Sequence, residues 1–114
     1  VLELLAERGT CLDVCPTSNV VLGVSPSLEE HPLPALLAAG VRCSIGADDP
    51  LLFGADVVDE YVSAHERMGV PEAQLVEVAR TSIESSFAPA EVKRDALARL
   101  GAWEDRAAWQ DGGA

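Results

Sequence analysis

The chain has 114 residues, a formal net charge of -11 and a hydrophobic fraction of 48%. This length fits at most one domain, and the hydrophobic fraction argues against disorder throughout. The excess of acidic residues argues against binding to nucleic acid or to an anionic membrane surface, because both attract Lys and Arg. No apolar run approaches the roughly 20 residues of a transmembrane helix, and no signal peptide is visible in the sequence.

The three cysteines, Cys11, Cys15 and Cys43, indicate reduced thiols in a cytoplasmic protein. An odd number of cysteines without a framework spacing is not typical of a disulfide-bonded scaffold. Cys11 and Cys15 are separated by three residues, which is not the usual spacing of a zinc-binding or redox pair. Small buried hydrophobic side chains are therefore the simpler interpretation of these two cysteines.

The first part of the chain predicts a helix followed by a short strand. Residues 1–8 have the pattern of the end of an amphipathic helix, and Gly9 terminates it. No N-cap residue precedes this helix, so a processed N-terminus and a start within a longer domain both fit the pattern. Residues 10–15 predict a strand that Pro16 ends, because proline cannot donate to a strand ladder. We expect residues 17–19 to form a polar loop at the end of this strand.

A second helix and a second strand follow. Ser27 and Glu30 have the spacing of a capping box, and they precede a short helix that Gly40 ends. Residues 41–45 alternate so that the apolar side chains lie on one side, which predicts a strand. Residues 46–50 then follow at the carboxyl end of that strand.

The rest of the chain predicts helices. Apolar residues at helical spacing cover residues 57–68, and Pro71 and Pro89 begin two further helices. We expect Gly101 to end the last helix and residues 102–114 to form a flexible tail.

The order of strand, helix and strand predicts parallel pairing with a helical crossover. Parallel sheets are normally covered on both faces and contain more than two strands. Two strands alone would leave both edges of the sheet open. The sequence therefore predicts an α/β chain that forms part of a larger fold.

Two polar clusters follow the two predicted strands, one formed by Thr17, Ser18 and Asn19 and the other by Asp48 and Asp49. Because parallel strands run in the same direction, both clusters should lie at the same rim, where the sites of α/β folds form. Two aspartates before a proline are also explained by a turn or by a helix cap. The functional alternative is that one carboxylate binds a metal while the other accepts a hydrogen bond from a substrate.

The two histidines of the chain, His31 and His65, do not complete a metal site. A catalytic zinc ion typically takes three protein ligands. His31 precedes a helix and His65 lies on a helix face, so we expect packed or capping histidines at both positions. The sequence also contains no nucleophile-elbow motif, no dinucleotide-binding motif and no Walker loop.

Several segments of the chain, in the same order, resemble the C-terminal part of adenosine deaminase-like hydrolases in the metal-dependent amidohydrolase superfamily. They are LDVCPTSNV at 12–20, HPL and AGV at 31–33 and 39–41, SIGADDPLLFG at 44–54, and the helix residues Glu60-Tyr61 and Ser85-Ser86-Phe87. The resemblance implies a (β/α)8 TIM barrel. Residues 1–101 would supply its last two parallel strands and its C-terminal helices.

The resemblance also implies an activity, the hydrolytic deamination of a purine amino group. In this family a zinc-activated water attacks the carbon that carries the amino group. Asp48 would be the carboxylate ligand of zinc, and Asp49 would hydrogen-bond the purine ring. Residues 17–19 would shape the rim without an assigned role. The H-x-H pair, the H-A-G-E segment with its proton-shuttling Glu and the further His of the family are absent, so we expect the isolated chain to be inactive.

The sequence leaves the substrate and the oligomeric state open. Gly46 and Ala47 stand where many members of the family carry Asn followed by Thr or Ser. Adenosine, adenine and an adenine-bearing nucleoside such as aminodeoxyfutalosine are therefore all candidate small-molecule partners. The alternative to part of an enzyme is a non-catalytic remnant or binding module of the same fold.

Overall fold

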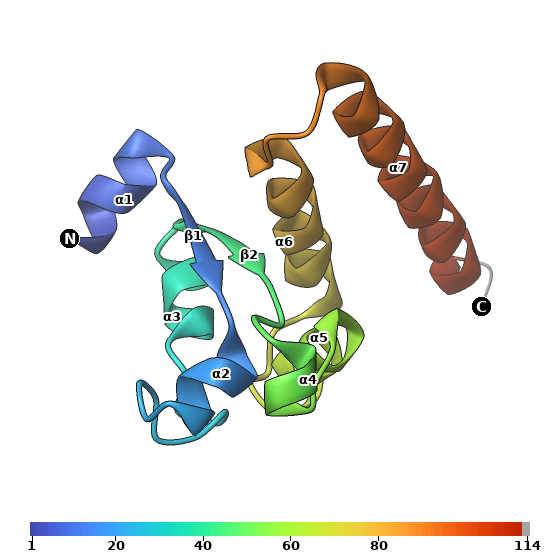
Figure 1. Cartoon of the computed structure of the whole chain (residues 1–114). Helices are drawn as coiled ribbons and strands as arrows, with labels where there is room; N and C mark the ends of the chain where they lie inside the picture. The colour runs from blue at the N-terminus through green and yellow to red at the C-terminus, as the bar shows by residue number, and fades with distance from the viewer. Residues whose placement is uncertain (113–114) are drawn as a thin grey trace.

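The computed structural model describes residues 1–112 and the side chains of residues 1–107. Helices surround a small sheet, and α1 and α7 lie at opposite sides of the molecule (Figure 1). In chain order the elements are α1 (Leu2–Arg8), β1 (Cys11–Val14), α2 (Pro16–Val21), α3 (Leu33–Ala38), β2 (Arg42–Ile45), α4 (Pro50–Phe53), α5 (Val57–Glu66), α6 (Glu72–Ser85) and α7 (Ala90–Gly112).

The sheet consists of β1 and β2, which pair in parallel. The register places Cys11 opposite Arg42 and Val14 opposite Ile45, so the two strands end side by side. Helices α2 and α3 form the crossover between them (Figure 1). The predicted strand, crossover and parallel strand are therefore confirmed.

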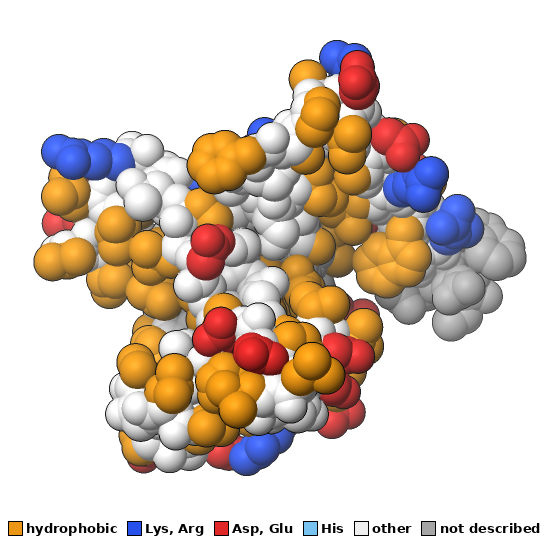
Figure 2. All heavy atoms as spheres, in the orientation of Figure 1, with side chains coloured by type: hydrophobic (Ala, Val, Ile, Leu, Met, Phe, Trp, Pro, Cys, Tyr) orange, Lys and Arg blue, Asp and Glu red, His pale blue; other side chains and the backbone are white. Residues whose placement is uncertain are grey.

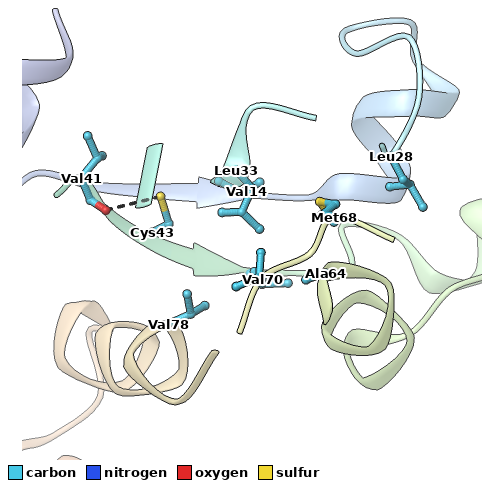
Figure 3. Close-up of a cluster of buried hydrophobic side chains, with 10 residues drawn as sticks. Val14, Leu28, Leu33, Val41, Cys43, Ala64, Met68, Val70 and Val78 are labelled. Atoms are coloured by element: carbon cyan, nitrogen blue, oxygen red, sulfur yellow. Dashed lines mark hydrogen bonds between the residues drawn. The ribbon is translucent and has the colours of Figure 1, made fainter. Parts of the chain in front are cut away.

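The core lies on the face of the sheet that the alternating apolar residues of β2 define. Val41, Cys43 and Ile45 are all buried, as their spacing predicts. Helix α6 packs along β2, and its Val78 points toward the sheet (Figure 3). Burial raises the pKa of the Cys43 thiol to about 11, so this side chain is a neutral hydrophobic group at pH 7. The buried cluster comprises Val14, Leu28, Leu33, Val41, Cys43, Ile45, Ala64, Met68, Val70 and Val78.

The prediction of a polar loop at residues 17–19 is wrong, because these residues belong to α2. Pro16 occupies the first turn of this helix, where its fixed φ and missing N–H cost nothing. The backbone N–H of Asn19 donates to the carbonyl of Cys15 at 2.9 Å, which closes the first turn. The proline that ends the strand therefore also begins a helix.

The prediction that Gly101 ends the last helix is also wrong, because α7 continues to Gly112. A glycine inside a helix costs only about 1 kcal/mol relative to alanine. The flexible character expected for residues 102–114 stays a prediction, and residues 113–114 lie outside the described part of the chain. Within the described part, no helix has both the length and the apolar composition needed to cross a bilayer.

Candidate functional site

The two polar clusters meet at the carboxyl ends of the strands. Ser18 lies in the first turn of α2, after β1, and Asp48 lies in the loop after β2. The Ser18 hydroxyl donates a hydrogen bond to Asp48 Oδ2 at 2.8 Å. Ser18 is almost fully buried whereas Asp48 is exposed, so the hydrogen bond is sheltered from water on the Ser18 side. The parallel register thus brings together two segments that the sequence could only place at the same rim.

Asp48 has an unusual backbone conformation. Its φ of 61° is the only positive φ at a non-glycine residue in the described part of the chain. Residues held in this region cost of order 1–3 kcal/mol and gather at functional sites. The loop therefore directs the Asp48 carboxylate toward Ser18 at an energetic cost that the surrounding contacts offset.

Cys15 borders the same loop. Its pKa is raised, first by burial and then by the negative charge of Asp48, with smaller effects of Glu60 and Asp13. The Cys15 side chain is therefore a neutral thiol at pH 7. It lies close to Gly46, where an added Cβ would stand 3.6 Å from the Cys15 sulfur.

Asp49 is the N-cap of the short helix α4. Its Oδ1 accepts hydrogen bonds from the backbone N–H groups of Leu51 and Leu52, each at 3.1 Å. The structure thus shows the helix-capping role that two aspartates before a proline allow. The contact of Asp49 with a substrate stays a prediction.

Asn19 and His31 connect α2 to the start of α3. The backbone N–H of Leu33 donates to His31 Nδ1 at 3.0 Å, so Nδ1 is unprotonated. The proton is on Nε2, which donates to Asn19 Oδ1 at 3.0 Å. Burial lowers the pKa of His31, which favours this neutral form. His31 is therefore a capping histidine, as expected.

His65 is likewise occupied within the helical part of the chain. Its Nδ1 donates to the carbonyl oxygen of Val70 at 2.9 Å, which ties the end of α5 to the segment before α6. This bond gives His65 a structural role, but the residue is exposed, so the expectation of a packed histidine is not confirmed.

Glu60 is a member of the site that its sequence position alone did not assign. This residue of α5 is 0% exposed, and its Oε2 accepts the backbone N–H of Thr17 at 3.1 Å. Its other oxygen, Oε1, has no hydrogen-bond partner among the described residues. The helical spacing carries a signal of this burial, because Glu60 lies four residues before the buried Ala64.

The described residues contain no cluster of three or more His, Cys, Asp and Glu side chains that could hold a metal ion. Asp48 supplies one carboxylate at the rim, oriented by Ser18. Beside it, the Ser44 hydroxyl donates to Asp13 Oδ1 on the sheet. Acidic and hydrophobic side chains are interspersed over the lower part of the molecule, which α2 and α4 form (Figures 1 and 2). A carboxylate such as that of Asp48 is one of the ligand types that zinc accepts, and a catalytic zinc takes three protein ligands. The rim could therefore supply only part of a zinc site.

An apolar groove lies elsewhere on the described surface. Its volume is about 540 Å³, and it lies between α5, α6 and α7, with Tyr61, Leu75, Leu100 and Trp103 in its wall. Burial raises the pKa of Tyr61, so its hydroxyl is neutral at pH 7. Because this apolar groove does not include the strand ends, the polar rim rather than this groove is the candidate site.

Comparisons with known proteins agree with this arrangement. The family described as adenosine deaminase matches residues 1–103. A putative adenosine/adenine deaminase of Streptomyces coelicolor is 47% identical over 103 residues, which are 90% of this chain and 30% of that protein.

Solved structures share the fold. The adenine deaminase of Arthrobacter aurescens superimposes with a TM-score of 0.86 and 33% identity, over 91% of this chain and 32% of that chain. An amidohydrolase of Burkholderia ambifaria with bound Zn aligns with a TM-score of 0.81 over 99% of this chain and 32% of that chain. Its identity is only 22%, so this likeness shows the fold alone. The chain spans about a third of the length of these relatives.

Proposed function

The chain belongs to the adenosine deaminase family, and we propose that it forms the C-terminal part of a (β/α)8 barrel that deaminates a purine by hydrolysis. The contact between Ser18 and Asp48 carries this proposal, because it fixes a carboxylate at the carboxyl ends of parallel strands. Catalytic residues of such barrels come from this end of the strands. The two parallel strands are too few to close a barrel, and the relatives are about three times as long as this chain.

Asp48 would be one ligand of a zinc ion in this barrel, with histidines from other strands as the remaining ligands. When bound, zinc would supply a water molecule activated for attack on the purine carbon that carries the amino group. Ser18 would keep the Asp48 carboxylate in one orientation, because its hydroxyl already donates to Oδ2.

Asp49 would hold the purine. Its Oδ1 is engaged by two backbone N–H groups of α4, which fixes the direction of the carboxylate. A carboxylate held in this way can accept a hydrogen bond from a ring N–H of the substrate. The same capping bonds would therefore orient the group that recognises the base.

The substrate would be a small molecule that carries the adenine ring, with adenine as the first candidate. The relative from Arthrobacter aurescens is an adenine deaminase, and the one from Streptomyces coelicolor is a putative adenosine/adenine deaminase. We further propose a cytoplasmic location, because Cys11, Cys15 and Cys43 are all free thiols.

Ammonia release by the complete protein that carries this chain tests the proposal. We expect release from adenine or adenosine, zinc bound to the protein, and loss of activity after chelation that added zinc restores. The 114-residue chain alone should neither bind zinc tightly nor release ammonia, because it supplies one carboxylate of the site. A complete protein without zinc and without deaminase activity on these purines would contradict the proposal. That result would favour the non-catalytic binding module, especially if the isolated chain unfolds cooperatively.

A further inference from the structure

The Glu60 carboxylate is buried in a way that calls for a physical explanation. Charged side chains are almost never fully buried unless they are paired, because removing an ionised group from water is costly. Glu60 is 0% exposed, and one backbone N–H is its hydrogen-bond donor among the described residues. A leucine would fill this place between helices at a lower desolvation cost. We therefore attribute the acidic residue at this position to its hydrogen bond with the Thr17 N–H.

That contact caps α2 from a distant part of the chain. The first N–H groups of a helix have no partner within the helix. The N-cap residue of α2, Cys15, forms no side-chain capping bond, and Pro16 has no N–H. Glu60 of α5 accepts the next one, the N–H of Thr17, at 3.1 Å. A carboxylate at this end also interacts favourably with the helix dipole.

The capped turn also carries the side chain that holds Asp48. Ser18 directly follows Thr17, and its hydroxyl donates to Asp48 Oδ2 at 2.8 Å. Asp48 in turn holds a left-handed backbone conformation that its surroundings must maintain. A displacement of the first turn of α2 would therefore move the Ser18 hydroxyl and release Asp48.

We propose that Glu60 is a positioning residue, which sets the orientation of Asp48 through the first turn of α2. This inference rests on the proposed function where it concerns the metal, and on the contacts alone where it concerns the link from Glu60 to Asp48. It gives helix α5, which lies outside the strand-end loops, a role in the arrangement of the site.

Three variants at one position test the inference in the complete protein. Glu60→Leu removes the acceptor, Glu60→Asp keeps the charge but withdraws it by one methylene, and Glu60→Gln keeps an acceptor oxygen at the same distance. Val78→Ala is the control, because Val78 is buried in α6 and its loss should lower the stability without moving α2. A general loss of stability is thereby separated from a loss of position.

The first measurement follows the backbone amide resonances of Thr17 and Asp48 in protein labelled with 15N-threonine and 15N-aspartate. We expect both resonances to shift in the leucine and aspartate variants, while the glutamine variant stays close to the wild type and Val78→Ala leaves both in place. An unchanged Asp48 resonance in these two variants, or an equal shift in Val78→Ala, would overturn the inference. If the leucine variant does not fold, the aspartate variant decides.

The second measurement uses cobalt(II) in place of zinc, because its visible absorption reports the geometry of the ligands. We expect the aspartate and leucine variants to change this spectrum and to weaken metal binding about 10-fold, as is typical when a group that orients a metal ligand is lost. Wild-type protein that binds no cobalt and deaminates nothing would refute the proposed function, while the amide resonances still decide the link. Wild-type protein that binds cobalt and is active, with variants of unchanged spectrum and affinity, would refute the positioning role alone.

Discussion

The buried cluster behind the sheet and the loops at the strand ends use hydrophobic and acidic residues in opposite ways. In the cluster, side chains such as Leu33 and Val78 are almost completely buried, and their contacts are apolar. Around the strand ends, the acid Glu60 of α5 is 0% exposed, whereas Leu51 of α4 is 99% exposed. The cluster thus follows the ordinary distribution of residues in a folded chain, and the strand ends depart from it.

This difference separates the residues that stabilise the fold from those that we expect to act in the site. The cluster stabilises the fold through burial, which depends on area and volume rather than on direction. The strand ends are held by directional hydrogen bonds between separate segments, such as that from Ser18 to Asp48. Changes in the cluster should therefore lower the free energy of unfolding, and changes at the strand ends should lower metal binding and turnover.

The largest effect is expected for Asp48→Asn in the complete protein that carries this chain. An amide lacks the charge that a zinc ligand supplies, so we expect turnover to fall to the background level, by more than the 10–100-fold typical of losing a group that only orients a ligand. Steady-state ammonia release and zinc content check this. The matched control is Asp95→Asn, which removes an exposed pair with Arg99 on α7 and should keep full activity. Full activity of the Asp48 variant would remove the assigned role.

Leu33→Ala should give the largest loss of stability, because Leu33 belongs to the buried cluster rather than to the strand ends. The side chain is completely buried, so its truncation should lower the free energy of unfolding by about 2–5 kcal/mol. Leu51→Ala is the matched control and should change it by less than about 0.5 kcal/mol, because Leu51 is exposed. Urea unfolding of the complete protein measures both. A large loss for Leu51→Ala would show that another part of the protein covers α4.

Ser18→Ala should test whether the orientation of the Asp48 carboxylate, rather than the stability of the fold, controls metal binding. The variant removes the donor to Asp48 Oδ2 and should lower zinc affinity or activity about 10–100-fold, as is usual for the partner of a metal ligand. The control is Ser27→Ala, whose hydroxyl accepts the N–H of Glu30 in an exposed turn and which should leave both quantities unchanged. Equal metal affinity in the wild type and the Ser18 variant would argue that Asp48 needs no such support.

The smallest effect concerns the pH dependence contributed by His31. Burial lowers its pKa in the folded chain below the ordinary value of about 6.5, so the folded state binds this proton less readily than the unfolded state. The contribution of His31 is therefore present above pH about 6.5 and is lost as the pH falls toward the folded pKa. Protonation of Nδ1 also breaks the bond from the Leu33 N–H.

Thermal unfolding between pH 7.5 and 5.5 measures this contribution. The melting temperature of the wild type should fall more on acidification than that of His31→Asn, in which an amide oxygen can accept the same N–H without titrating. An equal fall in melting temperature for the two proteins would contradict the assigned protonation state of His31.

Much of the fold was predictable because the signals are local. The alternation of Val41, Cys43 and Ile45 predicted the buried strand, and Gly9 and Gly40 marked the ends of helices. The same local reasoning failed at residues 17–19. Polar side chains there suggested a loop, whereas Pro16 begins a helix that is capped by a residue much farther along the chain.

The sequence by itself determined the order of the two strands and the longer helices, the parallel pairing of the strands and the rim to which Asp48 belongs. Periodicity, proline and glycine act within a few residues, so these features can be read along the chain. Only the tertiary structure decided that Ser18 holds Asp48 across 30 residues and that Glu60 caps α2 across 43 residues. The physical reason is that a hydrogen bond depends on distance and direction in space, which packing of the strands and helices sets and local sequence does not encode.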